Sequence, residues 1–147
     1  MEIEKAEKGL RRFYSAEKGL FVTASGQISW HSQVWAVLSG VLTAEKNVKV
    51  LENIAVSDTT FTMRTPYMMH YYLEALYSCG LKKKAFDFLK SYWGEIVACG
   101  FDRCPEIFNP NNQFESPYDA PEINSACHAW SCTPAYWLHM FDAAKDI

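Results

Sequence analysis

The stretch RTPYMMHYYLEALYSCG, residues 64–80, decides the fold class. Thr65 supplies a capping hydroxyl, and Pro66 suits the first position of a helix because its φ angle is already helical. Gly80 suits the left-handed conformation that commonly ends a helix. The residues between them carry a single carboxylate, Glu74, and are rich in aromatic side chains. They predict a helix over residues 67–79 that other elements enclose.

The flanking sequence predicts further helices of alternating character. They cover residues 3–14, 30–42, 45–56 (with Thr43 as N-cap), 82–99 and 135–144. The helices that begin at residues 30, 66 and 134 are nearly uncharged, whereas those at residues 3, 45 and 82 have charged faces. Alternating enclosed and surface helices in antiparallel pairs predict an all-α fold of three helical hairpins, half of a double-layered toroid. Strand signals are weak, with one short extended piece expected within residues 19–25.

Residues 101–125 interrupt this pattern with a long proline-rich loop. Its prolines are Pro105, Pro110, Pro117 and Pro121. Loops of this length in a compact domain are usually functional or disordered, and the loop's aromatic residues argue against disorder. Glu106 follows a proline and has apolar neighbours, so it could be held partly dry as a general base or acid. The alternative is a structural glutamate that accepts backbone N–H hydrogen bonds.

Two further clusters lie near predicted starts of enclosed helices. His128 and Trp130 precede the last helix; they could bind a sugar hydroxyl and stack on a sugar ring, or they could be a core histidine and a packing tryptophan. His31 and Tyr67 lie at the starts of two other such helices. Polar and aromatic groups at these starts would meet at one rim of a toroid, although each one alone is more often structural.

Composition limits the other function classes. The chain has 147 residues and a net charge of −3, which gives no basic surface for nucleic acid. No apolar stretch approaches the length of a membrane span, and no signal peptide is visible in residues 1–12, so localisation is not assigned. Five cysteines at wide spacing are expected to be reduced thiols rather than metal ligands. We expect no metal or cofactor, and no phosphate-binding loop or serine-nucleophile motif occurs.

Four motifs, in order, resemble the C-terminal half of the catalytic domain of glycoside hydrolase family 78, the α-L-rhamnosidases. They are Ser29 to Leu38, Thr65-Pro66-Tyr67 through Leu76, Tyr92-Trp93-Gly94 with the loop to Glu106, and Cys127-His128-Ala129-Trp130-Ser131 with Thr133 to Tyr136. The resemblance extends from about residue 10 to residue 141. It implies a single partial (α/α)6-barrel domain over residues 1–147 and a carbohydrate partner, a terminal α-L-rhamnoside.

The resemblance also implies an inverting mechanism with Glu106 as the general base. Relatives place a tryptophan before this glutamate, whereas this chain has Pro105. By the same resemblance, His128 would line the sugar subsite. Trp130, His31 and Tyr67 are expected as further contacts from their positions near the starts of enclosed helices.

The family's general acid lies in the other half of the barrel, so little or no activity is expected for this chain alone. Two alternatives remain open. One is a non-catalytic helical module that completes a barrel by pairing with itself or with the missing half. The other is a glycosidase for another sugar.

Overall fold

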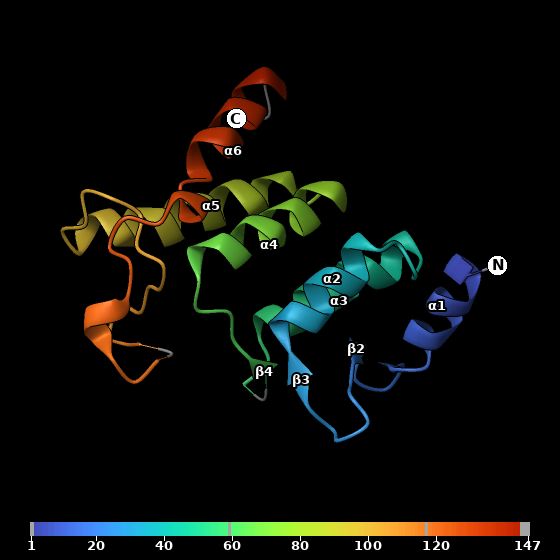
Figure 1. Cartoon of the computed structure of the whole chain (residues 1–147). Coiled ribbons are helices and arrows are strands. Elements are labelled where there is room, and N and C mark those ends of the chain that lie inside the picture. Colours follow the sequence, from blue (N-terminus) through green and yellow to red (C-terminus); the bar gives the residue numbers. More distant parts are fainter. Residues whose placement is uncertain (1, 59, 117, 145–147) are drawn as a thin grey trace. The chain divides into compact units, whose positions relative to one another are not determined.

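The computed structural model describes residues 2–58, 60–116 and 118–144, and these residues are mostly helical (Figure 1). Pro117 of the long loop lies outside them. The helices are α1 (Glu2–Arg11), α2 (Trp30–Leu38), α3 (Ala44–Ala55), α4 (Pro66–Ser78), α5 (Lys82–Ala98) and α6 (Pro134–Ala144). Two short 3-10 turns, η1 (Pro121–Ile123) and η2 (Ala129–Ser131), lie between α5 and α6. The all-α prediction is confirmed, since the strands are only two-residue pairs.

Two predicted helices are shorter in the structure. α1 ends at Arg11 rather than Tyr14, because Tyr14 pairs in a small sheet. α2 ends at Leu38 rather than Leu42, and Gly40 follows with a φ of 69°. Thr43 occupies the N-cap position of α3 as predicted, but its side chain makes no capping hydrogen bond to the helix.

The short strands form two pairs. β1 (Tyr14–Ser15) pairs antiparallel with β2 (Leu20–Phe21), and β2 lies within the extended piece expected at residues 19–25. β3 (Ile28–Ser29) pairs in parallel with β4 (Thr60–Phe61). Two-residue strands carry too little alternation to be seen in the sequence, and β3 and β4 were therefore missed.

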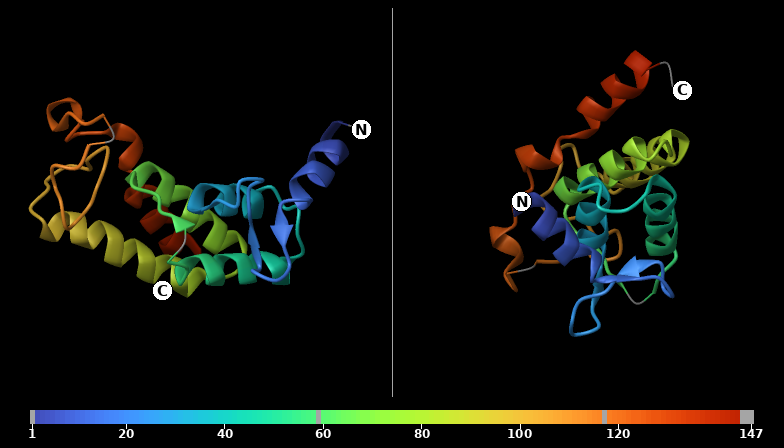
Figure 2. Two further views of the ribbon diagram at one scale, coloured as in Figure 1. Left: turned by 90° about the horizontal axis from the view of Figure 1, so that it is seen from below. Right: turned by 90° about the vertical axis from the view of Figure 1, so that its right-hand side faces the viewer.

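The chain divides into two compact units. The N-terminal unit comprises Met1–Met63 and Ala75–Leu81, and the C-terminal unit comprises Arg64–Glu74 and Lys82–Ile147. In the N-terminal unit α2 and α3 lie side by side (Figure 2). Their contact buries Val34, Val37, Val50, Leu51 and Ile54. The prediction of one partial-barrel domain stays a prediction.

In the C-terminal unit, aromatic contacts join the first turns of α4 to α5 and α6. Tyr72 packs edge-on against Phe88 at 4.9 Å, and Phe86 packs against the fully buried Phe141 at 5.2 Å. Trp137 donates from its indole N–H to Nδ1 of His70 at 2.9 Å. This bond positions α6 on α4 and requires an unprotonated Nδ1, in line with the pKa of His70, which burial lowers.

Two helices that were expected to be enclosed, α2 and α6, have apolar side chains that are exposed to solvent. Trp35 on α2 and both Tyr136 and Leu138 on α6 are about half exposed. α1 buries none of its side chains in the part of the chain that the structure describes. Nowhere in that part is a helix both long and apolar enough to span a membrane.

Candidate functional site

Four of the five predicted site residues lie in the C-terminal unit. Glu106, His128 and Trp130 come from the long connection between α5 and α6, and Tyr67 comes from the first turn of α4. His31, the second residue of α2, lies in the N-terminal unit. The C-terminal cluster is therefore the candidate site, and it does not include His31.

Backbone hydrogen bonds tie the two arms of the connection together around Glu106. The Glu106 N–H donates to the Ser125 carbonyl at 2.8 Å, and the Ser125 N–H donates back to Oε2 of Glu106 at 3.2 Å. Two residues earlier, the Cys104 carbonyl accepts from the His128 N–H at 2.8 Å. Glu106 and His128 thus lie on neighbouring arms of one folded loop. Glu106 also plays the structural part considered as the alternative, because it does accept a backbone N–H.

The charge on Glu106 is stabilised rather than disfavoured. The Ser125 N–H contributes most to lowering the pKa of Glu106, followed by the hydroxyl of Tyr118 and then the nearby His128. Desolvation acts in the opposite direction and is outweighed. The idea that burial tunes this carboxyl is therefore wrong, because hydrogen bonds to the charged form dominate. A carboxylate in this state can accept a proton but is poorly suited to donate one, which favours a base over an acid.

Tyr118 is a site residue that the sequence analysis did not identify. Its hydroxyl donates to Oε1 of Glu106 at 2.8 Å. Twelve residues separate the two, and only the folded loop brings them together. The loop's aromatic residues were the available signal, but they indicated order and not a partner for Glu106.

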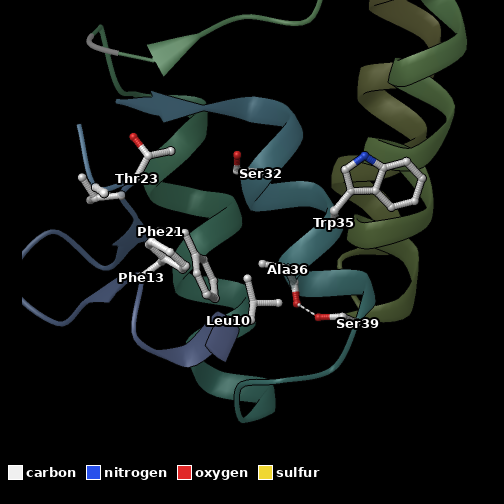
Figure 3. A pocket seen from close by; sticks show the side chains of 10 residues that line it. Leu10, Phe13, Phe21, Thr23, Ser32, Trp35, Ala36 and Ser39 are labelled. Carbon is white, nitrogen blue, oxygen red and sulfur yellow. Dashed lines mark hydrogen bonds between the residues drawn. The ribbon is translucent and has the colours of Figure 1, made fainter. Parts of the chain in front are cut away.

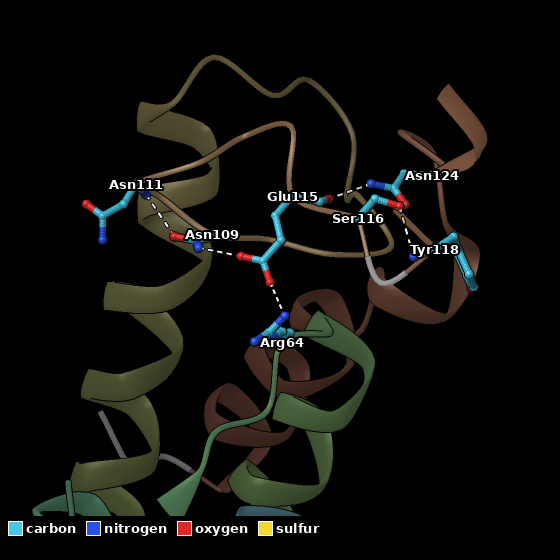
Figure 4. Close-up of polar contacts among 7 residues, drawn as sticks. All are labelled: Arg64, Asn109, Asn111, Glu115, Ser116, Tyr118 and Asn124. Atoms are coloured by element: carbon cyan, nitrogen blue, oxygen red, sulfur yellow. Dashed lines mark hydrogen bonds and ion pairs between the residues drawn. The ribbon is translucent and has the colours of Figure 1, made fainter. Parts of the chain in front are cut away.

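A polar network holds the part of the loop that carries Tyr118 (Figure 4). Arg64 forms an ion pair with Oε1 of Glu115 at 2.5 Å, and Nδ2 of Asn109 donates to Oε2 of the same carboxylate at 2.5 Å. The Glu115 carbonyl accepts from Nδ2 of Asn124 at 2.6 Å. Glu115 therefore joins Arg64, two residues before α4, to both arms of the loop.

His128, Trp130 and Tyr67 form a connected aromatic group. The Trp130 ring lies 5.5 Å from the Tyr67 ring and 5.7 Å from the His128 ring. Nδ1 of His128 is 3.2 Å from the Ser131 hydroxyl. Trp130 is 68% exposed, so it is not the packing tryptophan considered as an alternative. An exposed indole beside a tyrosine and an imidazole offers both an apolar face and polar hydrogen-bonding groups to a ligand.

The N-terminal unit contains a separate apolar cavity of about 610 Å³ (Figure 3). Its walls come from the end of α1, from β2 and the residues after it, and from one face of α2. None of the residues that line it is ionisable, and His31 is not among them. His31 is an exposed residue whose pKa is lowered by desolvation. This cavity suits an apolar partner better than a reaction that needs an acid or a base.

Two cysteines of the connection, Cys104 and Cys132, form hydrogen bonds with the His128 backbone. The Cys132 thiol donates to the His128 carbonyl at 3.7 Å, and burial raises the pKa of Cys104 to about 11, with further contributions from Cys132 and Cys127. All five cysteines are free thiols. Among the described residues, no group of three or more histidine, cysteine or acidic side chains is arranged to hold a metal ion.

Comparison with solved structures finds matches that include two rhamnosidases. A rhamnosidase from Klebsiella oxytoca with rhamnose bound is 40% identical over 90% of this chain, with a TM-score of 0.85. A family 78 rhamnosidase of Bacillus sp. GL1 is 24% identical over 90% of this chain, with a TM-score of 0.73, and shows the same fold. The chain spans 26% of the Klebsiella protein and 15% of the Bacillus protein.

The resemblance to family 78 rhamnosidases is thereby confirmed, and the chain corresponds to a segment of such a protein. No family model matches the sequence, and no curated protein matches it.

Proposed function

We propose that this chain is part of a glycoside hydrolase that cleaves terminal α-L-rhamnosides with inversion, and that Glu106 is the general base. The observation that carries the proposal is the Glu106 carboxylate, which accepts hydrogen bonds from Tyr118 and Ser125 on the same folded loop as His128 and the exposed Trp130. The similarity to a rhamnosidase with rhamnose bound supports a rhamnoside as the substrate.

In this mechanism Glu106 removes a proton from a water molecule that attacks the anomeric carbon. A second carboxyl group, roughly 6.5–9.5 Å away, protonates the departing oxygen from the opposite face of the sugar. Trp130 and Tyr67 would contact the C–H faces of the sugar, and His128 would bind a hydroxyl group. His31 is proposed as a further contact.

The chain alone is expected to have little or no activity, because the resemblance places the acid in another part of the barrel. A chimera tests the assignment: this chain replaces the matching segment of the Klebsiella rhamnosidase. Hydrolysis of 4-nitrophenyl α-L-rhamnoside is then measured for the chimera and for its Glu106→Gln variant. We expect a loss of about 10²–10⁴-fold in kcat, the usual contribution of general acid–base catalysis.

Glu122→Gln is the matched control, since Glu122 is an exposed glutamate of the same connection. It should leave kcat within about twofold of the parent chimera, well short of the loss expected for the base. Proton NMR of the first product should show the β-anomer of rhamnose. Full turnover by Glu106→Gln would show that Glu106 is not the general base. An α-anomeric first product would show that the mechanism is not inverting. A panel of other nitrophenyl glycosides tests the alternative of a different sugar.

The apolar cavity supports a second candidate, a non-catalytic module that pairs to complete a barrel. Phe13 and Trp35 at this cavity are 46% and 47% exposed, and α1 beside it buries no side chain among the described residues. In the Klebsiella protein the matched segment is only 26% of the chain, so the remainder can supply neighbours for these faces. The occupant we propose is accordingly a set of apolar helices from the rest of a rhamnosidase-type barrel.

A further inference from the structure

The loop before Tyr118 is fixed at several points. Glu115 is held by Arg64 and Asn109, as described above, and Asn124 binds its carbonyl. The Ser116 hydroxyl lies 3.0 Å from Oδ1 of Asn124 and accepts the Tyr118 N–H at 3.1 Å. These bonds form a continuous path from the ion pair at Arg64 to the backbone of Tyr118 (Figure 4). The backbone position of Tyr118 is therefore set by side chains whose partners are all within the C-terminal unit.

The residue after Tyr118 has an uncommon conformation. Asp119 has a φ of 53°, in the left-handed region that non-glycine residues seldom adopt. Such conformations persist only where the surroundings hold them. The turn at Asp119 and the hydrogen bonds of Glu115, Ser116 and Asn124 together position the Tyr118 hydroxyl against the Glu106 carboxylate.

The two oxygens of Glu106 are each engaged by one donor. Oε1 accepts from the Tyr118 hydroxyl at 2.8 Å, and Oε2 accepts from the Ser125 N–H at 3.2 Å. Each carboxylate oxygen has two lone pairs, so one donor on each oxygen still leaves room for a water molecule. This arrangement fixes the plane of the carboxylate while keeping it available as a proton acceptor.

We propose that Tyr118 is a positioning residue, whose hydroxyl holds Glu106 ionised and oriented as a general base. The inference rests on the proposed function of Glu106. The groups that face this carboxylate are the Tyr118 hydroxyl, the Ser125 N–H and His128, and all three favour its charged form. The effect is reciprocal, because the hydrogen bond to Glu106 raises the pKa of Tyr118 and keeps the phenol a donor.

The sign of the pH effect follows from this geometry. A general base must be ionised, so activity falls as pH drops through the pKa of Glu106. Tyr118 lowers that pKa and extends the active range to lower pH. Removing the hydroxyl while keeping the ring should move the acidic limb of the pH profile to higher pH. A residue that only pinned the loop would not move this limb.

The first test uses the 147-residue chain itself. The carboxyl carbon of Glu106 is titrated by NMR in the parent, in Tyr118→Phe and in Tyr14→Phe, a control in the N-terminal unit. The midpoint for Glu106 should move to higher pH in Tyr118→Phe and stay unchanged in Tyr14→Phe. The amide signals of Asn109 and Ser125 report whether the loop is still folded. An unchanged midpoint in a folded Tyr118→Phe variant would overturn the proposal.

The second test measures kcat/KM against pH in the rhamnosidase chimera, because this profile reports the pKa of the base in the free enzyme. The acidic limb should move in Tyr118→Phe by the same interval as the NMR midpoint, with a much smaller loss at the optimum than Glu106→Gln shows. A moved midpoint with an unmoved limb also overturns the role of Tyr118. If Glu106→Gln keeps full turnover, the proposed function itself fails. If it loses turnover while Tyr118→Phe changes neither readout, only the inference about Tyr118 fails.

Discussion

The side chain of Gln33, on α2, is fully buried against β2. Its amide forms hydrogen bonds with the backbone of Phe21 as a neighbouring strand would. Oε1 accepts the Phe21 N–H at 2.7 Å, and Nε2 donates to the Phe21 carbonyl at 2.7 Å. A second contact from Nε2 reaches the Ser29 carbonyl at 3.3 Å. A buried amide is tolerated only when its hydrogen bonds are made, and here both ends are engaged.

Gln33→Leu should therefore destabilise the chain although leucine is apolar and of similar size. The change leaves the N–H and the carbonyl of buried Phe21 unpaired, and each such group costs roughly 1–3 kcal/mol. We expect the free energy of unfolding in urea to fall by about 2–4 kcal/mol. Gln27→Leu is the control, since Gln27 is exposed and should change stability by less than about 0.5 kcal/mol. Equal stability of the two variants would show that the Gln33 bonds contribute little.

α4 was predictable because its sequence carries a start signal, an apolar helical pattern and a stop signal. Residues 64–80 contain all three, and α4 begins at Pro66 and ends at Ser78, one residue short of the predicted end. The end is a Schellman motif, in which the Gly80 N–H donates to Tyr77 and the Leu81 N–H donates to Leu76. Signals of this kind are local, so one sequence is enough to find them.

The contacts of the site were not predictable in the same way. Glu106 and Tyr118 could both be seen as residues of one long loop, but their hydrogen bond depends on Arg64, Glu115 and Asn124 folding that loop first. The interaction is set by partners far apart in the sequence, and no periodic pattern marks them. Grouping His128, Trp130 and Tyr67 was possible because all three lie near the starts of helices that the sequence predicts to be enclosed, and the resemblance to a family supported that grouping.

Two glycines of neighbouring elements should respond oppositely to the same substitution. Gly80 has a φ of 75°, Gly94 lies inside α5, and a Cβ atom at either position would meet nothing within 4 Å. Gly80→Ala should lower the free energy of unfolding by about 1–2 kcal/mol through backbone conformation alone. Gly94→Ala should raise it by about 0.5–1 kcal/mol, because alanine is the better helix former. Urea denaturation of both variants checks the signs, and a stabilising Gly80→Ala would contradict the cap.

At the scale of the whole molecule, the proposed catalytic residues and the apolar cavity lie in different units. The C-terminal unit carries Glu106, Tyr118 and the exposed aromatic group, whereas the N-terminal unit carries the apolar cavity. The chain spans 26% of the Klebsiella rhamnosidase, so both proposals concern one assembly with the rest of such a barrel. We propose that other parts of that barrel supply the acid and cover the cavity.

This assembly can be tested by mixing the chain with a Klebsiella rhamnosidase from which the matching segment has been removed. Trp35→Asp places a charge at the wall of the cavity, and an aromatic anchor at an interface is commonly worth at least about 2 kcal/mol. We expect sedimentation velocity to show a complex with the parent chain, weakened about 30-fold or more by Trp35→Asp. Phe114→Asp is the control, since Phe114 is 77% exposed and lies outside the cavity. Two results would exclude these helices as the occupant. Undiminished binding by Trp35→Asp would show that the complex does not use the cavity. Self-association of the chain in place of the complex would show that the cavity takes a second copy.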